Sequence, residues 1–139
     1  MKSILPFGAA LLAGLTMASC GSSFNFEGHW IGFRDQKLEP GQRAEILRTL
    51  TKIDLTLKPT GQFELLNAGL PFEGPWRQYG GKAYLKIESV LNRPIEESGY
   101  AKAGEKEIEL TPKPDGSIDY FDPGGYEEKP INLKREPKP

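Results

Sequence analysis

Side chains suited to catalysis or metal binding are scarce in this chain, which holds one cysteine, Cys20, and one histidine, His29. A zinc site needs three or four ligands, so a lone histidine without cysteine partners is a poor candidate. A Ser-His-Asp triad could recruit His29, but the sequence contains no Gly-x-Ser-x-Gly nucleophile motif. Alternation along a strand would also place His29 on the face opposite to Trp30. We therefore expect His29 to be exposed, and we assign no catalytic residue and no metal ligand.

The carboxylates offer little more. Two nearby carboxylates can serve as acid and base in glycoside hydrolysis, and the chain has two adjacent pairs, Glu96-Glu97 and Glu127-Glu128. Both pairs fall in predicted loops, so we interpret them as surface charge. Asp115-Gly116 resembles the start of a calcium loop, but the spaced oxygen ligands of such a loop are missing. We interpret it as a turn.

Cys20 ends an N-terminal segment that is organised like an export signal. Lys2 supplies a positive charge, and residues 4–17 form an uncharged apolar run. This run is shorter than the roughly 20 apolar residues that a permanent transmembrane helix needs. A charged start, a short apolar stretch and small residues before a cleavage site are typical of a secretory signal.

Met17-Ala18-Ser19-Cys20 resembles the lipobox of bacterial lipoprotein signal peptides, with Met17 where leucine is commonest. The resemblance implies cleavage before Cys20, a diacylglycerol on its thiol, and an acyl chain such as palmitate on the new amino group. Each buried methylene would contribute about 0.8 kcal/mol, so two or three chains anchor stably. The alternative is an ordinary cleaved signal with a chance cysteine. We expect no cofactor beyond this covalent lipid.

The resemblance also implies location and domain organisation. We expect a signal peptide at 1–19, the lipidated cysteine and a flexible tether at 20–26, and one domain at 27–139. The protein would be exported and lipid-anchored to the cell envelope. Gly21, rather than Asp, after the cysteine resembles lipoproteins sent to the outer membrane when the host is diderm. Loss of Lys2 with the signal changes the net charge from -1 to -2, and without a basic stripe we expect no nucleic-acid partner.

The mature part contains an internal repeat. Residues 53–66, IDLTLKPTGQFELL, align without a gap with residues 108–121, IELTPKPDGSIDYF. Each copy alternates apolar and polar residues, turns at Lys-Pro-x-Gly, and alternates again. Period-2 alternation around such a turn predicts a β-hairpin. Gly61 and Gly116 supply the residue with a positive φ that closes each turn.

Further strands are predicted around the two hairpins. Gly28–Asp35 reads as a first strand, Gly74–Tyr79 and Lys82–Val90 as a central hairpin with the turn Gly80-Gly81, and Ile131–Glu136 as the last strand. Trp76 should fill the interior. Pro40–Leu50 has apolar residues at helical spacing, and a short helix there could cover Ile31 and Phe33. Alternatively, Arg48–Lys58 could be one long strand. Seven or eight antiparallel strands favour a closed barrel or a tight sandwich.

Gly28-His29-Trp30 resembles the Gly-x-Trp motif with which lipocalins open their first strand. In that family a basic residue of the last strand packs over the indole. The resemblance implies an all-β fold, a small antiparallel up-and-down barrel of seven to eight strands with one short helix, closed by Trp30 and Arg135, with Lys134 as the fallback. The contact would contribute about 0.5–2 kcal/mol, depending on burial. A related family of copper-linked envelope lipoproteins carries Cys-x-x-Cys, which this chain lacks, so that function is not carried over.

Function is less determined. Two long loops, 92–104 and 122–130, each carry a tyrosine, Tyr100 and Tyr126, and tyrosine is favoured at recognition surfaces. We expect a structural or interaction module that contacts an envelope protein or glycan, because the barrel looks too small to be hollow. The alternatives are a barrel that binds a small apolar ligand and, more distantly, a hydrolase. The simpler interpretation is that each segment is a polar loop whose single tyrosine has its hydrogen-bond partner within the protein.

Overall fold

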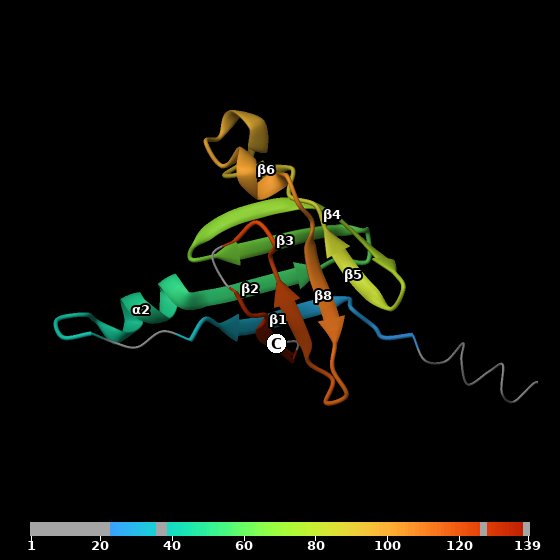
Figure 1. Ribbon diagram of the computed structural model, residues 1–139, viewed down its shortest axis with the longest axis horizontal. Helices are drawn as coiled ribbons and strands as arrows, with labels where there is room; N and C mark the ends of the chain where they lie inside the picture. Colours follow the sequence, from blue (N-terminus) through green and yellow to red (C-terminus); the bar gives the residue numbers. More distant parts are fainter. Residues whose placement is uncertain (1–22, 36–38, 126–127, 138–139) are drawn as a thin grey trace, which may run out of the picture.

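The computed structural model describes residues 23–35, 39–125 and 128–137. Within them the chain forms a closed eight-stranded antiparallel β-barrel with one short α-helix (Figure 1). The predicted fold class is therefore confirmed. The barrel strands are β1 (Gly28–Phe33), β2 (Lys52–Leu57), β3 (Gln62–Asn67), β4 (Leu70–Tyr79), β5 (Lys82–Leu85), β8 (Ile108–Pro112), β9 (Ile118–Phe121) and β10 (Ile131–Arg135).

The strands follow a simple meander. Each barrel strand pairs with the next one along the chain, and β5 pairs with β8 across an excursion. The barrel closes where β1 pairs with β10, which brings Trp30 opposite Arg135 and Ile31 opposite Lys134. The excursion contains the short strands β6 (Ser89–Val90) and β7 (Arg93–Pro94) and two 3-10 helices, η1 (Ile95–Glu97) and η2 (Ala101–Gly104).

The two repeated segments form hairpins with the same turn. In β2–β3, Lys58 N–H donates to Gln62 O at 2.9 Å, and Gly61 N–H donates to Lys58 O at 3.0 Å. In β8–β9, the corresponding bonds run from Lys113 to Ser117 at 2.9 Å and from Gly116 to Lys113 at 3.0 Å. The repeat in sequence is therefore a repeat in structure.

The central hairpin differs from its prediction. β4 is longer than expected, and its first half pairs with β3 while its second half pairs with β5. The predicted strand Lys82–Val90 is interrupted after Leu85 and resumes as β6 against Phe72 and Glu73. The interruption occurs where β4 passes close to this backbone: a Cβ on Gly74 would lie 1.9 Å from Lys86 O. A glycine inside a strand often marks a close approach of another backbone, so Gly74 is a local signal of this break that the strand prediction did not use.

The interior of the barrel is occupied by one continuous cluster of apolar side chains from alternate strand positions. Trp30 is completely buried, and its indole N–H donates to Phe26 O at 2.8 Å. Trp76 is only partly buried at the edge of the cluster, where its Nε1 donates to Lys58 O at 3.0 Å. The buried apolar residues are Phe26, Trp30, Ile53, Leu55, Leu57, Phe63, Leu65, Phe72, Ala83, Leu85, Ile87, Val90, Ile95, Ile108, Leu110, Ile118, Tyr120, Ile131 and Leu133.

The single α-helix of the described chain, α2 (Ala44–Thr51), runs directly into β2. It begins four residues after Pro40, which lies in a turn, so the predicted start was wrong, as was the alternative of one long strand. β1 likewise ends at Phe33, before the predicted Asp35. The prediction that α2 covers Phe33 was wrong: this residue is 36% exposed, although Arg48 Cζ lies 4.3 Å from the centroid of its ring.

The antiparallel meander gives the barrel two different ends. The hairpin end holds the turns at 58–61, 80–81 and 113–117, the start of β1 and the end of β10. The helix end holds α2, the β3–β4 turn at 68–69, the excursion at 86–107 and the loop after β9. Figure 1 shows α2 projecting from the barrel on the side opposite to the start of β1.

Candidate functional site

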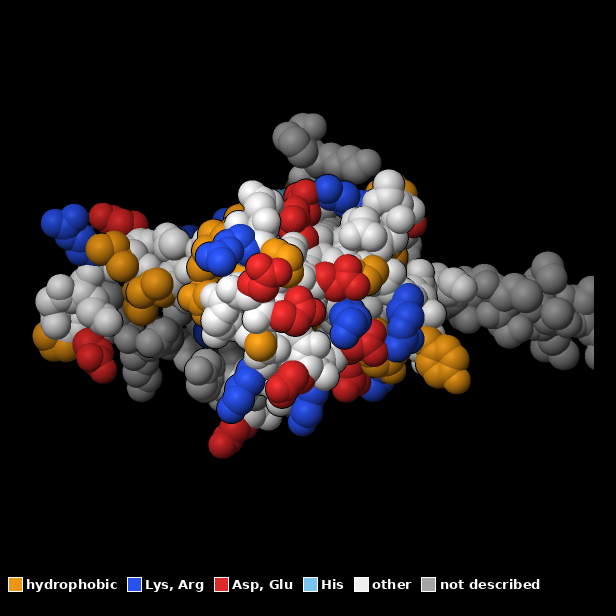
Figure 2. Space-filling model, turned by 90° about the horizontal axis from the view of Figure 1, so that it is seen from above, with side chains coloured by type: hydrophobic (Ala, Val, Ile, Leu, Met, Phe, Trp, Pro, Cys, Tyr) orange, Lys and Arg blue, Asp and Glu red, His pale blue; other side chains and the backbone are white. Residues whose placement is uncertain are grey.

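Exposed apolar side chains gather at the helix end. In the part of the chain that the structure describes, every large hydrophobic residue classed as exposed lies at this end, with the exception of Tyr79. We define the distal apolar face by five of them: Ile46, Leu50, Leu66, Leu91 and Tyr100. Figure 2 shows hydrophobic side chains on the projecting helical arm and on the adjoining surface of the barrel. A concentration of this kind is typical of an interaction surface rather than of scattered exposure.

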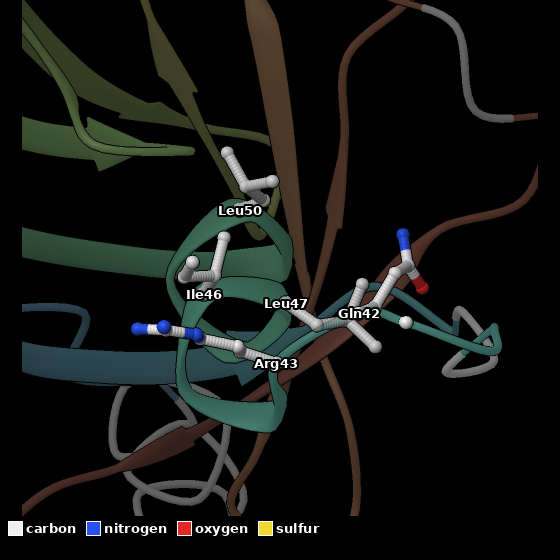
Figure 3. A pocket seen from close by; sticks show the side chains of 6 residues that line it. Gln42, Arg43, Ile46, Leu47 and Leu50 are labelled. Carbon is white, nitrogen blue, oxygen red and sulfur yellow. The ribbon is translucent and has the colours of Figure 1, made fainter.

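The helix contributes apolar side chains that the described part of the chain leaves exposed. Ile46 and Leu50 are one turn apart, so they point from the same side of α2 (Figure 3), and they are 52% and 51% exposed. Thr51, the last residue of α2, is buried where the helix runs into β2, and its hydroxyl donates to Leu47 O within the helix at 2.9 Å. A shallow hollow of about 240 Å³ lies beside these residues. α2 thus presents an amphipathic surface away from the core.

The β3–β4 hairpin and the excursion continue this surface. Leu66 faces outward on β3, opposite Pro71 on β4, and Pro71 O accepts a hydrogen bond from Leu91 N–H at 3.1 Å. The last turn of α2 also reaches this row, because a Cβ on Gly69 would lie 4.0 Å from Thr49 Cγ2. The elements of the distal apolar face are therefore contiguous.

Leu91 is held in an unusual backbone conformation. It forms the β6–β7 turn with Asn92, and the two residues have φ of 53° and 61°. Such turns favour Asn and Gly, because a side chain such as Leu at positive φ costs roughly 1–2 kcal/mol. The side chain is 53% exposed, so burial recovers little of that cost. A strained backbone that displays an apolar side chain makes Leu91 a candidate functional residue.

Tyr100, one of the two predicted binding tyrosines, lies between η1 and η2. It is 43% exposed, and its ring meets Phe72 edge-on at 6.3 Å between centroids. Its backbone N–H donates a hydrogen bond to Ser98 Oγ at 3.1 Å. The ring is thus supported from the core side and open on the other. Tyr126, the second predicted tyrosine, lies outside the described residues.

The structure brings Trp30 and Arg135 together at the hairpin end. Arg135 Cζ lies 4.3 Å from the Trp30 ring centroid. Its Nη1 donates to Glu27 O at 2.6 Å, and its Nη2 donates to Asn25 O at 2.5 Å. Gly28 makes the arrangement fit, because a Cβ there would lie 2.6 Å from Arg135 Nη1. The Gly-x-Trp spacing therefore has a steric reason in this chain.

His29 has a partner that the sequence did not reveal. Its Nε2 lies 2.5 Å from Asp54 Oδ1, and Lys52 Nζ lies 3.7 Å from Asp54 Oδ2. The His29 side chain is 42% exposed, as expected for an outward position. Asp54 and His29 are diagonal neighbours in the β1–β2 register, since His29 pairs with Thr56. This register is set by barrel assembly, so spacing along the chain could not identify the pair.

The acidic residues considered for catalysis or calcium binding lie in separate loops and turns. Glu96 and Glu97 lie in the exposed first turn of η1, Glu128 is exposed, and Glu127 lies outside the described residues. Asp115 caps its own turn, because Oδ1 accepts hydrogen bonds from Ser117 Oγ at 2.5 Å and Ser117 N–H at 3.0 Å. These bonds hold the pKa of Asp115 below its ordinary value. Within the described residues, no group of three or more His, Cys, Asp or Glu side chains could hold a metal ion.

Neither a protein-family model, nor a curated protein, nor a solved structure matches this chain. None of the helices in the described segments is long and apolar enough to span a lipid bilayer.

Proposed function

We propose that this protein is an exported envelope lipoprotein of bacteria, anchored through lipid on Cys20, whose distal apolar face binds a protein partner. The observation that carries the proposal is that the exposed large hydrophobic side chains of the described residues, apart from Tyr79, lie at the end of the barrel opposite the start of β1. The start of β1, where the tether joins, lies at the hairpin end. A partner would therefore meet the distal apolar face from the side away from the membrane.

The packing of the barrel favours interaction over ligand transport. A lipocalin-like carrier holds its ligand in a hollow interior, whereas here the inward positions form one continuous buried cluster. Apolar side chains such as Ile46 and Leu91 instead stand on the outside. A glycan partner would call for polar groups around an aromatic platform, and most of the distal apolar face is aliphatic. A protein surface is the better match.

The anchoring half of the proposal is tested by metabolic labelling with an alkyne fatty acid in a bacterial expression host. We expect the wild-type protein to incorporate the label and to sediment with membranes. The Cys20→Ala variant should lose both properties, because the thiol that would receive the diacylglycerol is gone. Labelling that persists in Cys20→Ala would contradict anchoring at this residue.

The interaction half is tested by photo-crosslinking in the cells that naturally produce the protein. A photoreactive phenylalanine analogue replaces Leu91 or Ile46, and the matched control replaces Gln62, which is exposed at the hairpin end. We expect one discrete protein adduct from Leu91 and Ile46 and none from Gln62. Hot-spot residues are few and central, so Tyr100→Ser should weaken the adduct at Leu91. Equal adducts from all three positions would mean non-specific contact.

Native mass spectrometry of the protein addresses the alternative of a ligand-binding barrel. A bare mass is expected. A reproducible added mass that survives Leu91→Ser would favour a small-molecule ligand held elsewhere in the domain. In that case the distal apolar face would no longer be the primary site.

A further inference from the structure

The hairpin end carries an aromatic surface at the edge of the barrel core. An open groove of about 500 Å³ runs between the segment before β1 and the β4–β5 hairpin. Its lining includes Phe24, Phe26, Tyr79 and Pro112, together with Gly80 and Gly81. The lining is mixed, because Ser23 and Gln78 lie beside the aromatic rings, and the hairpin tip bears no side chain at its two glycines.

Tyr79 is the most prominent residue of this surface. Its side chain is 73% exposed, and it is the one large hydrophobic residue exposed at the hairpin end within the described chain. Gly80 and Gly81 have φ of 60° and 81°, as a tight hairpin turn requires, and nothing lies within 4 Å of a Cβ built at either. The ring therefore stands beside a low, open tip that could approach a flat surface closely.

Phe24 is fixed next to this hairpin. Its carbonyl accepts a bond from Gln78 Nε2 at 3.4 Å, and its ring packs 4.8 Å from Phe26 and 6.0 Å from Trp30. It is only partly buried by these contacts. Phe24 and Tyr79 thus offer aromatic rings on the two sides of one groove.

The position of Cys20 limits what this surface can meet. Four Cα–Cα steps separate Cys20 from Phe24, and an extended chain covers at most about 14 Å in that number of residues. β1 has six residues and therefore runs for roughly 20 Å toward the other end. A lipid on Cys20 would keep the hairpin end near the bilayer and leave the helix end free to point away.

We propose that the groove-lining rings of Phe24 and Tyr79 dock on the bilayer surface and orient the barrel on the membrane. The inference rests on the proposed lipid anchor. Tyrosine and other aromatic rings favour the membrane–water interface, where an apolar body and a polar tip are both satisfied. The tether makes the contact intramolecular, so a weak interaction suffices to set orientation. A bilayer is the fitting occupant because the short tether brings it to this end before any diffusing partner arrives.

The docking is tested with a fluorescent label on the membrane-purified, lipidated protein. Cys20 is the only cysteine, and its thiol would carry the lipid, so Lys82→Cys supplies one free thiol for an environment-sensitive probe. Lys82 pairs with Tyr79 across the hairpin, so the probe lies beside the Tyr79 ring and leaves it in place. Leu91→Cys is the control, because Leu91 is an exposed turn residue at the helix end. Both proteins are reconstituted in phosphatidylcholine vesicles that contain a lipid with a headgroup-level spin-label quencher.

We expect loss of probe fluorescence at position 82 and none at position 91. A second, label-free measurement is hydrogen exchange of the wild-type protein, in which the amides of 79–82 should become protected on vesicles while those of 91–93 do not. Intact mass is measured first. An unmodified Cys20 would overturn the anchor and the docking together. A lipidated protein with no quenching at 82 and no added protection at 79–82 would overturn the docking alone.

Discussion

Substitution of Arg135 should destabilise the barrel more than its exposed position suggests. In Arg135→Ala the protein loses two hydrogen bonds, to the carbonyls of Glu27 and Asn25, and the contact of the guanidinium with the Trp30 ring at 4.3 Å. The two bonds are at the surface, where water competes, so we assign them about 1 kcal/mol together. The cation–π contact adds about 1 kcal/mol at a partly desolvated site. The expected loss is therefore about 2 kcal/mol in the free energy of unfolding.

Gly28 allows the same reasoning to be tested by a double-mutant cycle. A Cβ at position 28 would lie 2.6 Å from Arg135 Nη1 and would sit on a backbone with φ of 131°. Gly28→Ala should therefore cost both strain and displacement of the guanidinium, whereas in the Arg135→Ala background it should cost strain alone. We expect the two changes to be non-additive by about 1 kcal/mol.

The assay is urea denaturation at neutral pH, followed by tryptophan fluorescence. Arg135→Lys is the conservative control: it keeps the charge but cannot reproduce the two-pronged donation, so it should lose about half as much. An Arg135→Ala variant within about 0.5 kcal/mol of wild type would behave like an ordinary surface substitution. That result, or simple additivity with Gly28→Ala, would refute the role assigned to this contact.

Three further predictions concern Leu91, the glycines at 74 and 61, and Asp115. Leu91→Asn should raise the free energy of unfolding by about 0.5–1 kcal/mol in urea denaturation, because Asn tolerates positive φ. The same variant should abolish crosslinking from position 46. A destabilised variant would contradict the strain assigned to Leu91. Gly74→Ala should cost about 3 kcal/mol, because its Cβ would lie 1.9 Å from Lys86 O, whereas Gly61→Ala, in open space with φ of 88°, should cost about 1 kcal/mol on the same assay. The bonds from Ser117 lower the pKa of Asp115 in the folded protein from its ordinary value of 3.8. The ionised carboxylate therefore stabilises the fold above pH 3.8, and this stabilisation is lost as the pH falls through the pKa of the folded state. The urea midpoint of wild type should thus fall more steeply in acid than that of Asp115→Asn, and parallel curves would argue against the shift.

Much of the barrel could be predicted from local sequence. A hairpin is set by two neighbouring strands and the turn between them, so alternation around Lys-Pro-x-Gly predicts both the strands and their inward faces. Both repeats have the same turn hydrogen bonds, and Ile53, Leu55 and Leu57 are buried as the period requires. The contact of the last strand with Trp30 was indicated by family resemblance, not by any local pattern.

Other features depend on segments far apart in the chain. The break after Leu85 exists because β4 crosses close to that backbone at Gly74, and the pair of His29 with Asp54 depends on the β1–β2 register. Neither follows from spacing along the chain, because both depend on how two paired strands are registered against each other.

The candidate site shows the same division. Periodicity indicated apolar residues on a helix near 40–50, which suggested cover for the outer face of β1. Only the tertiary structure decided that this helix projects from the barrel and leaves Ile46 and Leu50 exposed. The sequence by itself thus determined which side chains share a face, since that follows from the repeat of helix and strand. Whether a face is covered depends on what the rest of the chain brings against it, and that is decided by assembly.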